Sequence, residues 1–157
     1  MLTTEQLQQI ADDPKEYLSR NYRIEMRIKA KRDRIEHLHN ICNSTTQEIK
    51  PVVVYTGPSK KLENCICEAI DLETEIRQEI VVLEQIQRET AEAIRLLMTN
   101  ENHKVLLELR YLTGKRWEEI AVDMDFTYRW TMTLHQQALA EMRKNAKTFG
   151  ESALTHI

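Results

Sequence analysis

The chain has 157 residues, a formal net charge of −3 and charged side chains at 30% of its positions, but only three glycines and three prolines. This composition is typical of long, solvated helices. It leaves no room for a glycine-rich phosphate-binding loop, and the small negative charge excludes a general affinity for nucleic acid.

No apolar run approaches the roughly 20 residues that a membrane span needs, and the N-terminal residues lack the apolar core of a signal peptide. We therefore expect a cytoplasmic protein with no membrane partner. Its three cysteines are expected to be reduced thiols.

Between residues 17 and 42, apolar side chains recur in steps close to three and four, which predicts a long helix with one narrow apolar seam. The seam residues are Tyr17, Ile24, Ile28, Ile35, Leu38 and Cys42. Thr3 and Gln6 have the spacing of a capping box for a short preceding helix, and Pro14 suits the first turn of the long one. Residues 43–60 contain two prolines and a glycine, and they predict a connector.

A second seam continues almost throughout at heptad spacing, which predicts another long helix. Its members are Leu62, Ile66, Ala69, Ile76, Ile80, Leu83, Ile94 and Leu97. Two long helices with narrow stripes are best buried against each other or against another chain. The early basic run from Lys15 to Arg34 is interpreted as a solvated face that pairs with the acidic second helix, with a second DNA contact as the alternative.

From Asn102 onward the pattern changes to short helices with a wider apolar face. Val105, Leu106, Leu109 and Leu112 predict a first helix that ends at Gly114. The inward faces of the next two helices are predicted to be Trp117, Ile120, Ala121 and Met124, then Thr131, Leu134, Ala138 and Met142. Phe126 would fill the corner between these two helices, and Thr127 would cap the second.

The sequence thus predicts an all-α protein with a long antiparallel helical hairpin or coiled coil, followed by a compact helix-turn-helix domain. The hairpin is assigned to residues 1–100, the helix-turn-helix to residues 101–147 and a tail to residues 148–157. The boundary is placed near residues 100–102.

The segment "LRYLTGKRWEEIA" at 109–121, followed by "FT", "LH" and "AL", resembles the fourth region of bacterial sigma factors. The chain is also similar to small phage-encoded proteins of the ArpU and RinA kind, and to a phage family of unknown function with a long-helix front half and an "STT" linker. This resemblance implies a regulator of phage transcription in the bacterial cytoplasm. It also implies promoter DNA or host RNA polymerase as partner, without a cofactor.

The sigma-factor resemblance places one face of the last helix in the major groove of double-stranded DNA. The candidate DNA-binding residues are Arg116, Tyr128, Arg129, Trp130, Met132, Thr133, Gln136, Gln137 and Lys144. Arg129 has the donors for a bidentate contact to guanine, and Gln136 or Gln137 suits adenine or a phosphate. Arg116 departs from the family pattern because a serine or threonine usually caps the second helix, and Trp130 departs because a small or polar residue is usual.

Other functions remain open at this point. The basic and acidic residues of the last module nearly balance, so the module is alternatively a surface that binds a host protein. A structural coiled-coil protein is a third possibility, and a homo-oligomer through the long helices is expected. A zinc site from His37, His39, Cys42, Cys65 and Cys67 is disfavoured by the Cys-x-Cys spacing. No nucleophile with a neighbouring base is evident, so no enzymatic activity is expected.

Overall fold

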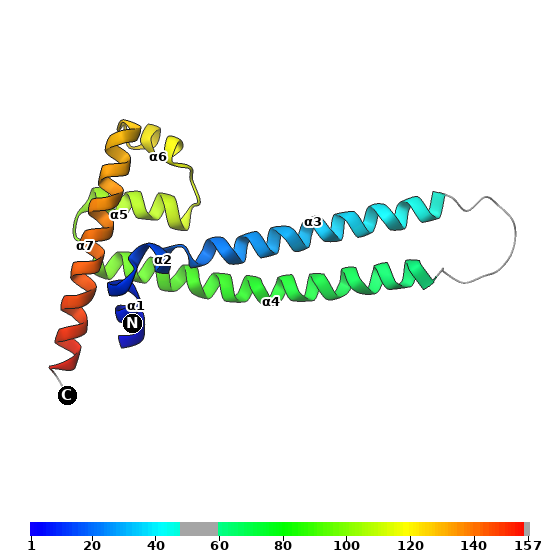
Figure 1. The fold of residues 1–157 in the computed structure, drawn as a ribbon, viewed down its shortest axis with the longest axis horizontal. Helices are drawn as coiled ribbons and strands as arrows, with labels where there is room; N and C mark the ends of the chain where they lie inside the picture. Colours follow the sequence, from blue (N-terminus) through cyan, green and yellow to red (C-terminus); the bar gives the residue numbers. More distant parts are fainter. Residues whose placement is uncertain (48–59, 156–157) are drawn as a thin grey trace, which may run out of the picture. The chain divides into compact units, whose positions relative to one another are not determined.

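The computed structural model describes residues 1–47 and 60–155, and every regular element in these ranges is helical (Figure 1). The elements are α1 (Thr4–Asp12), α2 (Pro14–Leu18), α3 (Arg20–Gln47), α4 (Lys60–Leu97), α5 (Glu101–Leu107), the π-helical segment η1 (Glu108–Leu112), α6 (Trp117–Asp123) and α7 (Tyr128–Leu154). The predicted all-α fold is confirmed. Within the described ranges, no helix is both long and apolar enough to cross a bilayer.

Two predicted non-helical stretches are shorter than expected. Of the predicted connector at 43–60, α3 includes the first residues up to Gln47 and α4 begins at Lys60. The rest of that connector, with its "VVVY" run, lies outside the described residues. Residues 148–154, predicted as a tail, continue α7.

The chain forms two compact units, and they divide it differently from the predicted boundary near residues 100–102. One unit comprises Met1–Asn21 and Glu84–Ile157, and the other comprises Tyr22–Leu83. The reason lies in α4, whose Ala93, Ile94 and Leu97 are fully buried and belong to the core of the first unit. The last turns of α4 therefore pack with the helix-turn-helix rather than with the hairpin.

The first unit also draws on the N-terminal residues. Leu7 and Ile10 of α1 and Leu18 of α2 belong to the same buried cluster as Leu139 and Met142 of α7. The predicted capping box is present, because the Thr3 amide donates to Gln6 Oε1 at 2.9 Å and the Gln6 amide donates to Thr3 Oγ1 at 3.2 Å. Pro14 starts a short helix that ends at Leu18, so the predicted long helix begins at Arg20 instead.

In the second unit, α3 and α4 run antiparallel and bury the predicted seam between them (Figure 1). Ile24, Ile28 and Leu38 of α3 are buried, as are Ala69 and Ile76 of α4. The assignment of Ile66 to the seam is wrong, because its side chain is 48% exposed. Cys65, Ala69, Leu72 and Ile76 carry the alternation of four and three residues, and Ile66 lies about 100° round the helix from Cys65.

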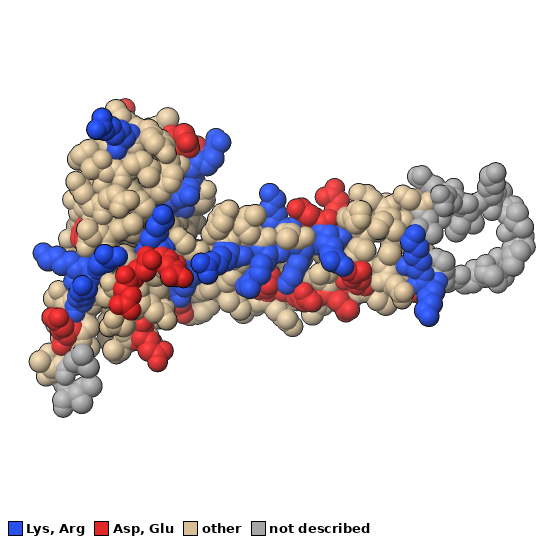
Figure 2. Space-filling view, viewed as in Figure 1, with Lys and Arg blue, Asp and Glu red and all other residues tan. Residues whose placement is uncertain are grey.

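A row of ion pairs joins one flank of this hairpin. Arg27 Nε lies 3.4 Å from Glu79, and Lys31 Nζ lies 3.0 Å from both Glu75 and Glu79. Arg34 pairs with Glu68 nearer the far end of the helices. Figure 2 shows basic side chains gathered along the hairpin beside acidic ones. The expected pairing of the basic run with the acidic helix is confirmed, although such exposed pairs contribute little stability individually.

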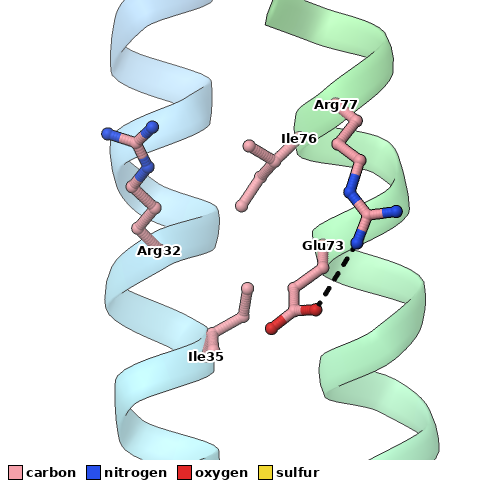
Figure 3. A pocket seen from close by; sticks show the side chains of 5 residues that line it. All are labelled: Arg32, Ile35, Glu73, Ile76 and Arg77. Atoms are coloured by element: carbon pink, nitrogen blue, oxygen red, sulfur yellow. Dashed lines mark ion pairs between the residues drawn. The ribbon is translucent and has the colours of Figure 1, made fainter.

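The hairpin also carries an open groove between the two helices, shown in Figure 3. Ile35 of α3 and Ile76 of α4 point toward each other and form its apolar floor. Arg32, Glu73 and Arg77 complete the lining, and the Arg77 Nη2 atom lies 3.8 Å from the Glu73 carboxylate on the same helix. Apolar surface in the hairpin is therefore left partly open to solvent.

Candidate nucleic-acid interface

The helix-turn-helix pair consists of α6 and the first half of α7, with α6 lying across the N-terminal end of α7 (Figure 1). Ile120 and Ala121 of α6 are buried. Thr131, Leu134, Ala138 and Met142 of α7 are buried as well, which confirms both predicted inward faces. Trp117, Met124 and Phe126 pack against this core while remaining partly accessible.

The turn between the two helices is a Schellman motif. Asp125 adopts a left-handed backbone conformation with φ of 55°. The Phe126 amide donates to the Ala121 carbonyl at 2.9 Å, and the Asp125 amide donates to the Val122 carbonyl at 3.1 Å. Thr127 then caps α7 as predicted, because its Oγ1 accepts from the Trp130 amide at 3.2 Å. The turn thus fixes the direction in which α7 leaves α6.

Asp125→Gly is expected to raise the free energy of unfolding by roughly 0.5–1 kcal/mol, since glycine adopts the left-handed conformation without steric cost. Urea unfolding followed by circular dichroism measures the change. Asp125→Ala, at the same position, is the matched control and is expected to lower stability, since alanine disfavours the left-handed conformation. A loss of stability in Asp125→Gly would contradict the assigned turn geometry.

The start of α6 shows how the chain replaces the usual hydroxyl cap. The Arg116 amide donates to Glu119 Oε2 at 2.8 Å, so a carboxylate from the first turn satisfies one N-terminal amide. The Arg116 side chain is exposed, and its Nε lies 3.8 Å from the same carboxylate. Its charge is therefore partly neutralised by Glu119.

The helix preceding α6 differs from its predicted form. Val105, one of the apolar residues that predict this helix, is 41% exposed, whereas His103, Leu106 and Leu107 are buried. From Glu108 the backbone follows π-helical hydrogen bonding, and the Thr113 amide donates to the Glu108 carbonyl at 3.1 Å. Each hydrogen bond of a π-helical turn spans five residues instead of the four of an α-helix, so the turn changes which of the following side chains face the core. The segment ends as predicted at Gly114, with φ of 74°.

The predicted DNA-contacting residues other than Arg116 lie on α7, and all of these but Met132 are exposed. Tyr128 is 50% exposed and Trp130 is 44% exposed. Arg129, Thr133, Gln136, Gln137 and Lys144 are exposed too. Met132 is half-buried, so less of its surface is available to a partner.

Several cations of the module already have partners within the protein. Arg110 donates to the Lys115 carbonyl at 2.9 Å, Lys115 pairs with Asp123 at 2.5 Å, and Arg143 donates to the Asp12 carbonyl at 3.4 Å. Figure 2 shows mainly uncharged side chains around α6 and the first half of α7 on the face drawn. Within the described ranges, the exposed Arg129, Lys144 and Lys147 of α7 form no ion pair, so their charges are available to a partner.

Acidic residues shape the outer side of α6. Lys115, Glu118, Glu119, Val122 and Asp123 line an open groove of about 400 Å³. Val122 in this groove is 80% exposed. A groove with three carboxylates repels phosphate, so α6 contributes little attraction for a DNA backbone.

Sequence reasoning assigned no role to His135, yet this residue is 2% exposed. Its Nε2 shares a hydrogen bond of 2.8 Å with the Tyr111 hydroxyl, and its ring centroid lies 4.5 Å from that of Trp117. Burial, followed by the charges of Lys15 and Arg110, lowers the pKa of His135 to about 4, while burial raises the pKa of Tyr111 to about 12. This cluster holds η1 and α6 against α7. The spacing of four residues from Thr131 is the sequence signal that places His135 on the buried face.

Glu141, counted from sequence only as a negative charge, joins α7 to the α4–α5 junction. Its Oε1 accepts from the Thr99 amide and hydroxyl, both at 2.7 Å, and from the Asn100 amide at 3.2 Å. Its other oxygen pairs with His103 Nδ1. Although burial raises the pKa of Glu141, the hydrogen bonds from Thr99 and His103 outweigh it and lower the pKa to about 2. No sequence motif announces these partners.

The residues considered for zinc are not gathered into one site. His37, His39 and Cys67 are exposed, whereas Cys42 and Cys65 are half-buried. Within residues 1–47 and 60–155, no three histidine, cysteine or acidic side chains are arranged to hold a metal ion.

With this geometry in view, the chain was compared with known proteins. Neither family models, nor curated proteins, nor solved structures give a match to it.

Proposed function

We propose that this protein binds double-stranded DNA through the first half of α7 and regulates transcription at promoters. The observation that carries the proposal is the α6–turn–α7 geometry. A Schellman turn and a threonine cap fix the start of α7, which buries one face in the core and leaves the opposite, polar face exposed. A helix presented in this way has the diameter to enter the major groove.

The exposed side chains of α7 supply the chemistry for reading bases. Arg129 stands in the first turn, where its guanidinium can donate two hydrogen bonds to the O6 and N7 atoms of guanine. Gln136 and Gln137 carry the amide groups that pair with adenine or a phosphate, and the Thr133 methyl group suits a thymine methyl. Lys144, about four helical turns beyond Arg129, suits a phosphate rather than a base.

Weak phosphate attraction is the expected consequence of the intramolecular contacts of Arg110, Lys115, Arg116 and Arg143. Each helix-turn-helix should therefore show a shallow dependence of log affinity on log salt concentration. Two modules joined in one oligomer would recover affinity through a high effective concentration. We assign this joining to a second copy of the chain that pairs through the long helices, whose Ile70 and Val81 are 56% and 64% exposed.

Arg129→Ala is expected to weaken binding to the best DNA site by roughly 1–3 kcal/mol and to relax preference at one base position, because a bidentate guanine contact is lost. Lys144→Ala is the matched control and should weaken all sequences alike, because it removes a phosphate contact. DNA fragments that bind the full chain are first selected from a genomic library. Titrating each variant with the selected fragments at several salt concentrations then measures both effects. Unchanged affinity and selectivity in the Arg129→Ala protein would contradict the placement of α7 in the major groove.

A protein-binding role is the second candidate, favoured by the exposed aromatic rings of Tyr128 and Trp130 on α7. Exposed aromatic side chains are enriched where proteins bind each other, and host RNA polymerase is the partner that the sigma-factor resemblance implies. Trp130→Ala distinguishes the candidates: it should abolish polymerase capture in this role, while Arg129→Ala should matter more for DNA. A structural coiled-coil protein would show neither activity.

A further inference from the structure

The antiparallel hairpin places Cys42 of α3 opposite Cys65 of α4. The ion pairs Arg27–Glu79 and Lys31–Glu75 set the register of the two antiparallel helices, because four residues forward along α3 match four residues back along α4. Leu38 and Ala69, the next seam residues, are both buried. Four residues onward along α3 is Cys42, and four residues back along α4 is Cys65, so both steps move about 6 Å in the same direction at 1.5 Å per residue. The two cysteines therefore occupy one layer of the seam.

The two thiols are in direct contact. The Cys42 side chain is hydrogen-bonded to that of Cys65, and both residues are half-buried. Burial and the neighbouring Cys65 together raise the pKa of the Cys42 thiol. Cys67 lies only two residues further along α4, but it is exposed. Two residues correspond to about 200° of rotation, which turns Cys67 away from α3.

We propose that Cys42 and Cys65 form a reversible intramolecular disulfide that locks α3 to α4, with a low-molecular-weight disulfide such as oxidised glutathione as the oxidant. A disulfide needs Cβ atoms roughly 3.5–4.5 Å apart, and two opposed seam positions with hydrogen-bonded side chains are the place in the hairpin where such an approach is expected. The positions are also reachable by a small oxidant, because neither residue is fully buried.

The chemistry is a balanced thiol–disulfide exchange. The thiolate of one cysteine attacks a sulfur of the oxidant, which forms a mixed disulfide and releases one small thiol. The second cysteine, after losing its proton to solvent, attacks the protein sulfur of that mixed disulfide and releases the second small thiol. Two protein thiols are oxidised to one disulfide, and one small disulfide is reduced to two thiols.

The product would close the chain between residues 42 and 65 and leave the buried seam intact. Closing a loop restricts the unfolded chain, so the oxidised hairpin should resist unfolding more than the reduced one. The lock would act on the hairpin that we propose to join two copies, yet its chemistry does not depend on DNA binding.

The test uses the full chain, reduced and then exposed to a graded ratio of oxidised to reduced glutathione. Free thiols should fall from three to one per chain, and peptide mass spectrometry should find Cys42 joined to Cys65. Cys67→Ser is the matched control and should still form this bond, with one titratable thiol fewer. Cys42→Ser and Cys65→Ser should form no intramolecular bond, and circular dichroism verifies that each variant keeps its helices.

Dithiothreitol should reverse the change, and the thermal midpoint of the parent should be higher in the oxidised form. The proposal would be overturned if the folded parent formed glutathione adducts alone, disulfides through Cys67, or disulfides between chains. Equal oxidation of parent and Cys65→Ser would overturn it as well.

Discussion

Glu141→Ala is expected to lower the free energy of unfolding of the first unit by roughly 1.5–3 kcal/mol. The substitution removes one carboxylate that accepts from the Thr99 amide, the Thr99 hydroxyl and the Asn100 amide. Hydrogen bonds to a charged acceptor are stronger than neutral ones, but Thr99 and Asn100 are exposed, and water replaces part of what is lost. Urea unfolding at neutral pH measures the difference.

Glu141→Gln is the matched variant, because it keeps an acceptor oxygen and removes the charge; about half of the loss is expected. The effect also has a pH signature. The pKa of Glu141 is lowered to about 2 from an ordinary value of 4.5, so its contribution is complete above pH 4.5 and disappears as the pH falls toward 2. A parent and a Glu141→Ala protein that lose stability in parallel over that window would contradict the role of the ionised carboxylate.

Lowering the pH from 6.5 to 4 is expected to reduce the free energy of unfolding of the first unit by up to about 3 kcal/mol, because of His135. The pKa of this buried ring is lowered to about 4 from 6.5, so the unfolded chain binds a proton that the folded chain excludes. The stability that comes from keeping the ring neutral is complete above pH 6.5 and is lost as the pH falls to 4. Unfolding by urea at half-unit steps of pH measures the slope.

His135→Gln provides the comparison for this second effect, because an amide can retain a hydrogen bond to the Tyr111 hydroxyl without titrating. Its stability should be lower than that of the parent at pH 7 and nearly independent of pH between 6.5 and 4. The contribution of Glu141 is lost below pH 4.5, so the two contributions overlap only between about pH 4 and 4.5. An identical slope in the parent and in His135→Gln would refute the assignment.

The hairpin could be predicted because one requirement, burial of a narrow apolar seam on each long helix, determines the spacing of its apolar residues. Ile24, Ile28 and Leu38 lie buried where their spacing put them, as do Ala69 and Ile76. The helix-turn-helix was predictable for the same reason, with Leu134, Ala138 and Met142 on the core side of α7. Periodicity reports which side of a helix is buried, but not which other element buries it.

The parts that sequence missed depend on local backbone geometry or on distant partners. The backbone becomes π-helical from Glu108, and no residue type announces such a turn. Glu141 finds its partners 41 and 42 residues earlier in the chain, in Asn100 and Thr99. The exposure of the α7 residues follows from the periodicity, whereas no sequence pattern indicates that the neighbouring cations are held in intramolecular contacts. DNA recognition by these residues stays a prediction.

The assembly of the first unit from both ends of the described chain has a consequence for biosynthesis. Leu7, Ile10 and Leu18 are synthesised before the hairpin, whereas α7, which shares their core, is synthesised after it. Arg143 reaches back across 131 residues to the Asp12 carbonyl. The intervening hairpin can pair its helices as soon as Leu83 leaves the ribosome, because it is compact by itself. The N-terminal apolar residues must wait for roughly 5–25 s at about 5–20 residues per second. Over that interval they are the segment most open to chaperones and proteases, and a ribosome that stalls within α7 leaves them without their core.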